Sequence, residues 1–170
     1  MDRTGGNGPD LLRHFSPLER VVLTANGNLQ RIISSYYNAA VTIDVKHCEE
    51  VQPFIYERDV ALMVLGREFC VAKSVVILHS PMSRKAFKTG TLALGQLFQA
   101  FHIRPRFELL KAGRTTVELS EDDDAQRSGA KSEPSFKRGK LWRLYDLKSW
   151  HLSCRIYEEF ATDLFELEDR

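Results

Sequence analysis

The sequence predicts a single α+β domain in which an antiparallel sheet carries helices on one face. Three observations favour this fold class. Helix signals come first in the chain, runs of strong β-formers dominate after residue 39, and the connections between these runs are short enough for hairpins. With 170 residues, the chain is long enough to bury one substantial core.

Bulk composition limits the classes of partner and compartment. The 24 basic and 23 acidic residues give a net charge of +1, so no basic excess indicates a nucleic acid or an anionic membrane surface. No run approaches the roughly 20 apolar residues that a membrane span needs, and the first ten residues lack the apolar run of a signal peptide. Cys48, Cys70 and Cys154 share no metal-ligand spacing and are typical of reduced thiols. We therefore expect a cytoplasmic protein without nucleic-acid or membrane partners.

Two helices are predicted near the N-terminus, after a leader over residues 1–14 that we expect to be disordered. Ser16-Pro17 begins the first helix, because serine is a good N-cap and proline is favoured at the first helical position. Gly27 can adopt a positive φ and end that helix, and a second helix follows over residues 29–37. The predicted apolar faces comprise Leu18, Val21, Val22 and Ala25 in the first helix and Leu29, Ile32, Ile33 and Tyr36 in the second.

Strands are predicted in four later parts of the chain. Residues 39–49 alternate apolar and polar side chains, and two runs of β-formers flank Gly66-Arg67 as the arms of a hairpin. Residues 104–119 indicate a strand pair or one long bent strand, and residues 140–160 a closing hairpin. Residues 80–103 favour helix, with a start at Ser80-Pro81 and a break at Gly90. The polar, low-complexity run 120–139 is expected to be a mobile loop.

Familiar catalytic motifs are absent from the sequence. There is no glycine-rich phosphate loop, no HExxH, no Cys-x-x-Cys and no GxSxG, and the five histidines share no spacing. More informative are Arg58, Lys73, Arg155 and Glu158, which are charged residues inside predicted strands. Such charges ordinarily point to water in a one-sided sheet. Alternatively, basic side chains on adjacent hairpin arms converge on one cavity and bind an organic carboxylate, while an acidic residue handles a hydroxyl or a proton. The pattern leaves both interpretations open.

The run "SPLERVVLTANGNLQRIISSYY" resembles the N-terminal signature of the chorismate pyruvate-lyase-like superfamily, in particular its short archaeal, cyanobacterial and plastid members. The resemblance continues in chain order over about residues 15 to 165, apart from the loop at 120–139. The matching segments are Arg58-Asp59-Val60-Ala61-Leu62, "VAKSVVIL", "ALGQLF", "RFELL" and "RIYEEFA". We therefore expect residues 15–170 to form one domain of this type.

The resemblance implies an antiparallel sheet of about six strands, with helix–turn–helix flaps closing over an internal ligand cavity. The activity it implies is removal of pyruvate from chorismate to give 4-hydroxybenzoate, or a hydroxybenzoate isomer, with no metal or organic cofactor. By position, Arg58 matches the arginine that grips a substrate carboxylate, and Lys73 falls near a basic position. Glu158, or Glu159 one residue along, matches the glutamate near the aromatic ring and its hydroxyl. The substrate contacts implied at the elbow and at a later helix start are Asn26, Gly27, Asn28, Leu29, Leu94 and Gly95.

Departures from the family pattern bear on the substrate more than on the fold. Asn28 stands where relatives carry threonine or methionine, and Ala93 and Ala161 replace prolines. One alternative is therefore a related enzyme that cyclises, isomerises or dehydrates another small metabolite. Another is a non-catalytic small-molecule binding module, because the fold is shared with effector-binding domains of bacterial transcription regulators; a protein-interaction scaffold is a third. In the main interpretation the partner is a small organic acid, and the chain is a monomer or a weak dimer.

Overall fold

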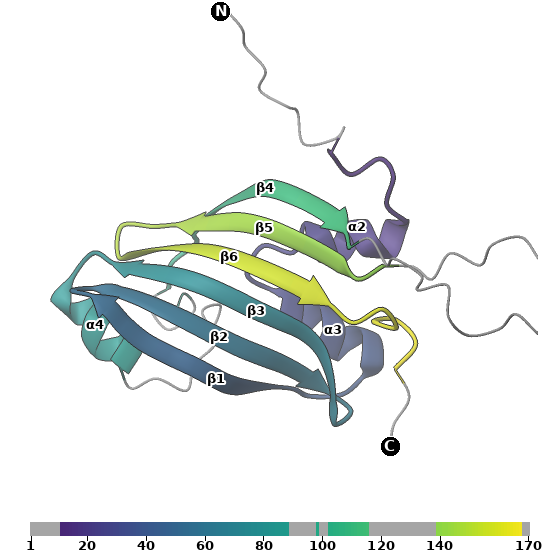
Figure 1. The fold of residues 1–170 in the computed structure, drawn as a ribbon, viewed down its shortest axis with the longest axis horizontal. Helices are drawn as coiled ribbons and strands as arrows, with labels where there is room; N and C mark the ends of the chain where they lie inside the picture. Colours follow the sequence, from purple (N-terminus) through teal and green to yellow (C-terminus); the bar gives the residue numbers. More distant parts are fainter. Residues whose placement is uncertain (1–10, 89–97, 99–101, 116–138, 168–170) are drawn as a thin grey trace, which may run out of the picture.

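A computed structural model of the protein describes residues 11–88, 98, 102–115 and 139–167. Six strands form one antiparallel open sheet in the order β1-β2-β3-β6-β5-β4 (Figure 1). The strands are β1 (Val41–Gln52), β2 (Ile55–Val64), β3 (Arg67–Leu78), β4 (Arg106–Arg114), β5 (Leu141–Lys148) and β6 (Leu152–Phe160); the labelled helices are α2 (Pro17–Leu23), α3 (Leu29–Tyr37) and α4 (Pro81–Lys88). The α+β class predicted from the sequence is confirmed.

Hairpins account for most of the strand pairing. β1 pairs with β2, β2 with β3, and β5 with β6, and each pair is consecutive in the chain. The β2–β3 turn carries positive φ at Leu65 and Gly66, of 52° and 70°, which is the conformation of a tight two-residue hairpin turn. In the segment after residue 103, the described residues contain one irregular strand, β4, whose register shifts between Leu109 and Lys111.

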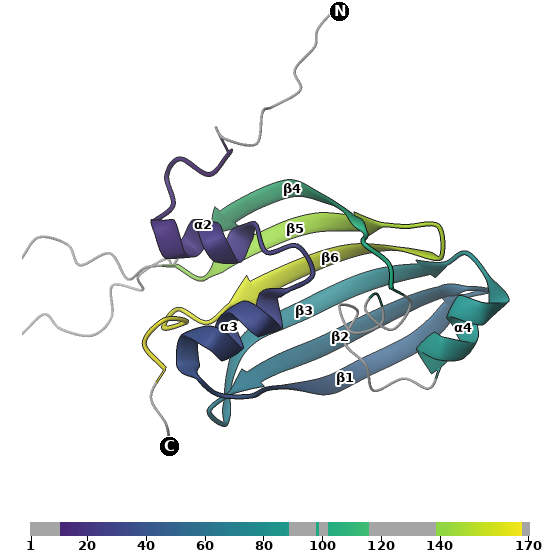
Figure 2. The same cartoon turned by 180° about the vertical axis from the view of Figure 1, so that it is seen from behind.

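Helices α2 and α3 lie on the same face of the sheet, joined by an elbow over residues 24–28 (Figure 2). Ser16 caps α2 as predicted: its hydroxyl accepts a hydrogen bond from the backbone N–H of Glu19, whose carboxylate accepts one from the N–H of Ser16. Leu18 and Val21, expected on the buried face, are 45% and 48% exposed. The buried residues of α2 are instead Glu19, Val22 and Leu23.

Side chains alternate between two faces of the sheet, as strand geometry requires. In β3, Lys73, Val75 and Ile77 are exposed on the outer face, whereas Ser74 and Val76 are buried beneath the helices. We call the helix-covered face the inner face; it holds the core. Within the expected leader, Leu12 is buried against this core.

Several expectations fall on residues that the structure does not describe. These are residues 1–10 of the leader, the break at Gly90, and residues 120–138 of the expected loop. Of the helices in the described ranges, none has the length and apolar character needed to cross a membrane.

Candidate functional site

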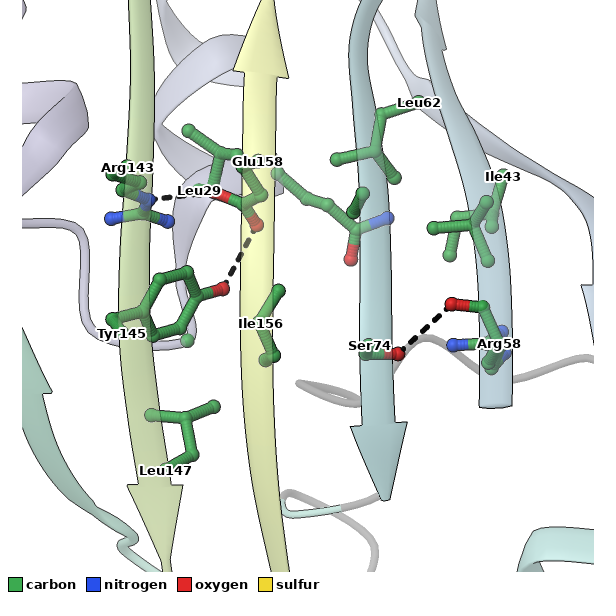
Figure 3. Close-up of a pocket in the computed structure, with 14 residues that line it drawn as sticks. Leu29, Ile43, Arg58, Leu62, Ser74, Arg143, Tyr145, Leu147, Ile156 and Glu158 are labelled. Atoms are coloured by element: carbon green, nitrogen blue, oxygen red, sulfur yellow. Dashed lines mark hydrogen bonds and ion pairs between the residues drawn. The ribbon is translucent and has the colours of Figure 1, made fainter. Parts of the chain in front are cut away.

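A cavity lies between the inner face of the sheet and the elbow that joins α2 to α3 (Figure 3). The cavity volume, counted as the space open to the centres of water molecules, is about 70 Å³. On this measure, roughly 10–15 Å³ is enough for one water. Apolar side chains make most of its wall, and a few polar groups converge on it. Its lining consists of Gly27, Leu29, Gln30, Ile43, Arg58, Val60, Leu62, Ala72, Ser74, Arg143, Tyr145, Leu147, Ile156 and Glu158.

A buried ion pair forms one end of the cavity. The β5–β6 register places Arg143 directly beside Glu158 on the inner face, and Nε of Arg143 donates to Oε2 of Glu158 at 2.6 Å. The Arg143 side chain is fully buried, and that of Glu158 is 6% exposed. The hydroxyl of Tyr145 donates to the other oxygen, Oε1, at 2.9 Å. Both oxygens of Glu158 are therefore engaged.

The same arginine is bonded to the elbow. Nη1 of Arg143 lies within hydrogen-bond distance of the carbonyl oxygens of Val22, Leu23 and Ala25, at 2.9, 3.1 and 2.9 Å. Val22 and Leu23 are the last residues of α2 and Ala25 follows it in the elbow, so the carbonyls lie at the helix end where the dipole is negative and favours a cation. Nη2 of Arg143 is buried, and no described residue accepts a hydrogen bond from it.

Electrostatics at this end favour a charged arginine and a neutral phenol. Burial disfavours the Arg143 cation, but the charge and hydrogen bond of Glu158, together with Tyr145 and Cys70, outweigh it, so the pKa of Arg143 lies above its usual value. Burial, reinforced by the charge of Glu158, raises the pKa of Tyr145 well above its usual value. The guanidinium of Arg143 also lies 4.3 Å from the centroid of the Tyr145 ring, in cation–π contact.

Arg58 stands at the opposite end of the cavity, on β2. It is 3% exposed, and burial lowers the pKa of its guanidinium. The hydroxyl of Ser74, its neighbour on β3, donates to the Arg58 backbone carbonyl at 3.2 Å. Three strand spacings separate β2 from β5, and the register aligns Arg58 with Tyr145, so their backbones lie about 14 Å apart across the sheet, with Arg143 two residues further along β5. Apolar side chains such as Ile156 occupy the floor between them.

The start of α3 borders the same cavity. Gly27 has a φ of 66°, which lets the chain turn from the elbow into the helix, and Leu29 and Gln30 line the cavity. Asn28 occupies the N-cap position but makes no side-chain capping hydrogen bond. The first N–H groups of a helix have no intrahelical acceptor and form the positive end of its dipole.

The structure brings together four of the residues that the resemblance implied for the site. Arg58, Glu158, Gly27 and Leu29 all line the cavity. Between the two candidate glutamates, Glu158 faces inward; Glu159 lies on the outer face, where its Oε1 accepts a hydrogen bond from Nζ of Lys140 at 2.8 Å.

Asn26 and Asn28 are exposed and are not among the cavity-lining residues. Leu94 and Gly95 lie outside the described residues.

Lys73 is exposed on the outer face, so the interpretation in which Arg58 and Lys73 converge on one cavity is wrong. A regular hairpin around Leu65-Gly66 would pair these two residues on one face. A register shift between Leu62 and Met63 instead pairs Arg58 with Ser74 and turns Lys73 away. A one-residue shift moves every later side chain to the opposite face.

Sequence reasoning missed Arg143, Tyr145 and Ser74. One available signal was the alternation in "LWRLYDLK", where Arg143 and Tyr145 share a face with Leu141 and Leu147. The signal was ambiguous because Trp142 and Leu144 make the other face apolar as well.

Among the described residues, no group of three histidine, cysteine or acidic side chains is placed to hold a metal ion. Compared with models of known protein families and with curated proteins, the sequence matches none of them.

Proposed function

We propose that this protein is a cofactor-independent lyase that removes pyruvate from chorismate and leaves 4-hydroxybenzoate or a hydroxybenzoate isomer. One observation carries the proposal. Arg58 and Glu158, which the family resemblance assigns to the substrate carboxylate and the ring hydroxyl, are both buried and line the same cavity. Burial of a charged side chain costs free energy, and buried ionisable groups in a cavity are typical of functional sites.

Substrate binding would use two positive groups. The guanidinium of Arg58 can hold one carboxylate through two parallel N–H donors, in a site where exclusion of water strengthens the attraction. The second carboxylate of chorismate would approach the start of α3, whose first two residues, Leu29 and Gln30, line the cavity. The ring then lies over the apolar floor of the sheet.

The proposed reaction needs little catalytic assistance from the protein. The bond between the ring carbon and the enolpyruvyl oxygen breaks, the ring loses one proton and becomes aromatic, and the enolpyruvate gains one proton to become pyruvate. Aromatisation makes the reaction favourable, so the protein needs to orient the substrate, exclude water and assist proton movement. Glu158 is the one carboxylate among the described lining residues, and it keeps lone pairs beyond those used by Arg143 and Tyr145.

A coupled assay tests the proposal. Purified protein mixed with chorismate should release pyruvate, which lactate dehydrogenase converts with loss of NADH absorbance, and the acid product should be a hydroxybenzoate in equal amount. Lys73→Met is the matched control, because it removes an exposed cation from the outer face and should leave the rate unchanged. No pyruvate at high protein concentration would rule out the lyase.

One observation favours a second candidate, a non-catalytic binding module. Both oxygens of Glu158 already accept hydrogen bonds, from Arg143 and from Tyr145, which is the arrangement of a carboxylate that maintains structure. In that case chorismate or a hydroxybenzoate would raise the melting temperature and be recovered chemically unchanged. Chromatography of the ligand after incubation therefore separates the two candidates.

A further inference from the structure

One buried donor of a cavity-lining residue, Nη2 of Arg143, has no hydrogen-bond partner among the described residues. The other nitrogens of this guanidinium are occupied, because Nε donates to Glu158 and Nη1 faces backbone carbonyls at the end of α2 and in the elbow. The whole Arg143 side chain is buried at the cavity wall. Buried donors in native proteins nearly always have a partner. A group that enters the cavity is the available one.

Local charge decides what kind of acceptor suits this donor. Glu158 already balances the charge of Arg143, and the carbonyls of Val22, Leu23 and Ala25 add the negative end of α2. A second carboxylate at Nη2 would lie close to Glu158 in a site with little water, where like charges repel strongly. An uncharged oxygen satisfies the donor without this repulsion.

We infer that Nη2 of Arg143 is a ligand-binding donor, and that the cavity takes a small ring acid with an uncharged oxygen acceptor at the end remote from Arg58. The inference rests on the proposed function in one respect, that the cavity binds a small organic acid. It adds a hydrogen-bond donor at the far end of that acid: with the carboxylate at Arg58 on β2, the hydroxyl or carbonyl oxygen accepts a hydrogen bond from Arg143 on β5, beside Glu158. The two arginines then have different roles: Arg58 binds the carboxylate, and Arg143 donates a hydrogen bond to the uncharged oxygen.

The arrangement also links the ligand to the elbow. The guanidinium that would contact the ligand oxygen holds the carbonyls of Val22, Leu23 and Ala25 with a neighbouring nitrogen. A ligand at Nη2 therefore adds a bond to the group that fixes the elbow over the cavity.

Equilibrium binding of four para-substituted benzoates tests the inference on the full chain. 4-Methylbenzoate offers no hydrogen bond, 4-formylbenzoate offers an acceptor only, 4-aminobenzoate is mainly a donor, and terephthalate carries a second charge. Titration calorimetry should find 4-formylbenzoate bound about tenfold or more tightly than 4-methylbenzoate, which is the effect of one hydrogen bond to a charged donor. 4-Aminobenzoate and terephthalate should gain no such advantage. A preference for the donor would instead assign the subsite to Glu158 and overturn the inference.

Arg143→Lys keeps a positive charge beside Glu158 but removes Nη2. In this variant the ratio of the two affinities, formyl over methyl, should fall close to one, whereas Lys73→Met should keep the wild-type ratio. Should Arg143→Lys fail to fold, the wild-type protein still decides, because equal affinity for the formyl and methyl acids overturns the inference without any variant.

The outcomes separate this inference from the proposed function. If the protein prefers 4-formylbenzoate to 4-methylbenzoate but releases no pyruvate from chorismate, the role of Arg143 is supported and the proposed lyase activity is ruled out. Pyruvate release without acceptor preference does the reverse. If none of the benzoates binds the wild-type protein, the inference fails because the cavity then does not take small ring acids.

Discussion

Arg143 and Glu158 form a buried ion pair between neighbouring strands, with Nε of the arginine 2.6 Å from Oε2 of the glutamate. The pair connects three parts of the molecule. Glu158 holds the hydroxyl of Tyr145, and Arg143 holds the end of α2 across the cavity. Such pairs are costly to bury and depend on full hydrogen bonding of both partners. The pair therefore maintains the shape of the cavity whatever ligand occupies it.

Glu158→Gln should destabilise the protein by about 3 kcal/mol or more, because it leaves the Arg143 cation buried without a counter-charge. Urea denaturation followed by circular dichroism measures the change in the free energy of unfolding. Glu159→Gln is the matched control, one residue along on the outer face, where its partly exposed ion pair with Lys140 is worth about 1 kcal/mol or less.

Removing both charges should restore much of the stability. Arg143→Met combined with Glu158→Leu leaves no uncompensated charge, so the double variant should be more stable than Glu158→Gln alone. A double variant less stable than the single one would contradict the assignment of the loss to a stranded charge.

Arg58→Met should abolish binding of 4-hydroxybenzoate while the protein stays folded. Methionine fills similar space at this buried position and carries no charge, so the variant should still unfold in one cooperative transition. Thermal unfolding with and without the acid measures both the transition and the binding. Global unfolding of the variant would instead make Arg58 a structural residue and remove it from the site.

The strands were predictable because local chemistry decides them. Runs of β-formers and the positive-φ glycine at the β2–β3 turn, Gly66, are enough to indicate a hairpin. Arg58 and Glu158 came from the resemblance, and each lies on the inner face. The helical start at Ser16-Pro17 was predictable for a similar reason, since a capping serine followed by proline acts within one turn.

The face of the sheet on which Lys73 lies was not predictable, because it depends on the pairing register of β2 and β3. The shift between Leu62 and Met63 carries no sequence signal, yet it decides that Ser74 rather than Lys73 shares a face with Arg58. Arg143 was missed for a related reason. Its place beside Glu158 depends on the pairing of β5 with β6. The three backbone carbonyls near Nη1 lie about 120 residues earlier in the chain, so local sequence does not reveal these contacts.

Low pH should reduce the free energy of unfolding, partly through protonation of Glu50. The guanidinium of Arg84, with both Glu50 oxygens 2.7 and 2.8 Å from its Nη2, and the backbone N–H of Phe54 lower the pKa of Glu50 to about 2. Because the folded pKa is depressed, this contribution to stability is present above the unfolded pKa, near 4.5, and is lost as the pH falls from 4.5 toward 2.

Glu50→Gln should therefore be less stable than the wild type at pH 6, and the difference should shrink as the pH approaches 2. Denaturant midpoints at several pH values measure it. Arg84→Met removes the partner and should show the same shrinking difference. A difference between wild type and Glu50→Gln that stays constant from pH 6 to pH 2 would refute the role of this ion pair.

Gly27 in the elbow and Gly66 in the β2–β3 turn form a matched pair of glycines, which separates the effect of backbone strain from that of ligand contact. Gly27 and Gly66 have φ of 66° and 70°, and a Cβ on either would meet no atom within 4 Å. Alanine at each position should therefore cost a similar free energy of unfolding, about 1 kcal/mol, because an L-residue is strained at positive φ. Only Gly27 lines the cavity, so only Gly27→Ala should also weaken binding of 4-hydroxybenzoate beyond its effect on stability. Equal loss of binding in Gly66→Ala, at the distant β2–β3 turn, would mean that general destabilisation rather than the elbow controls the ligand.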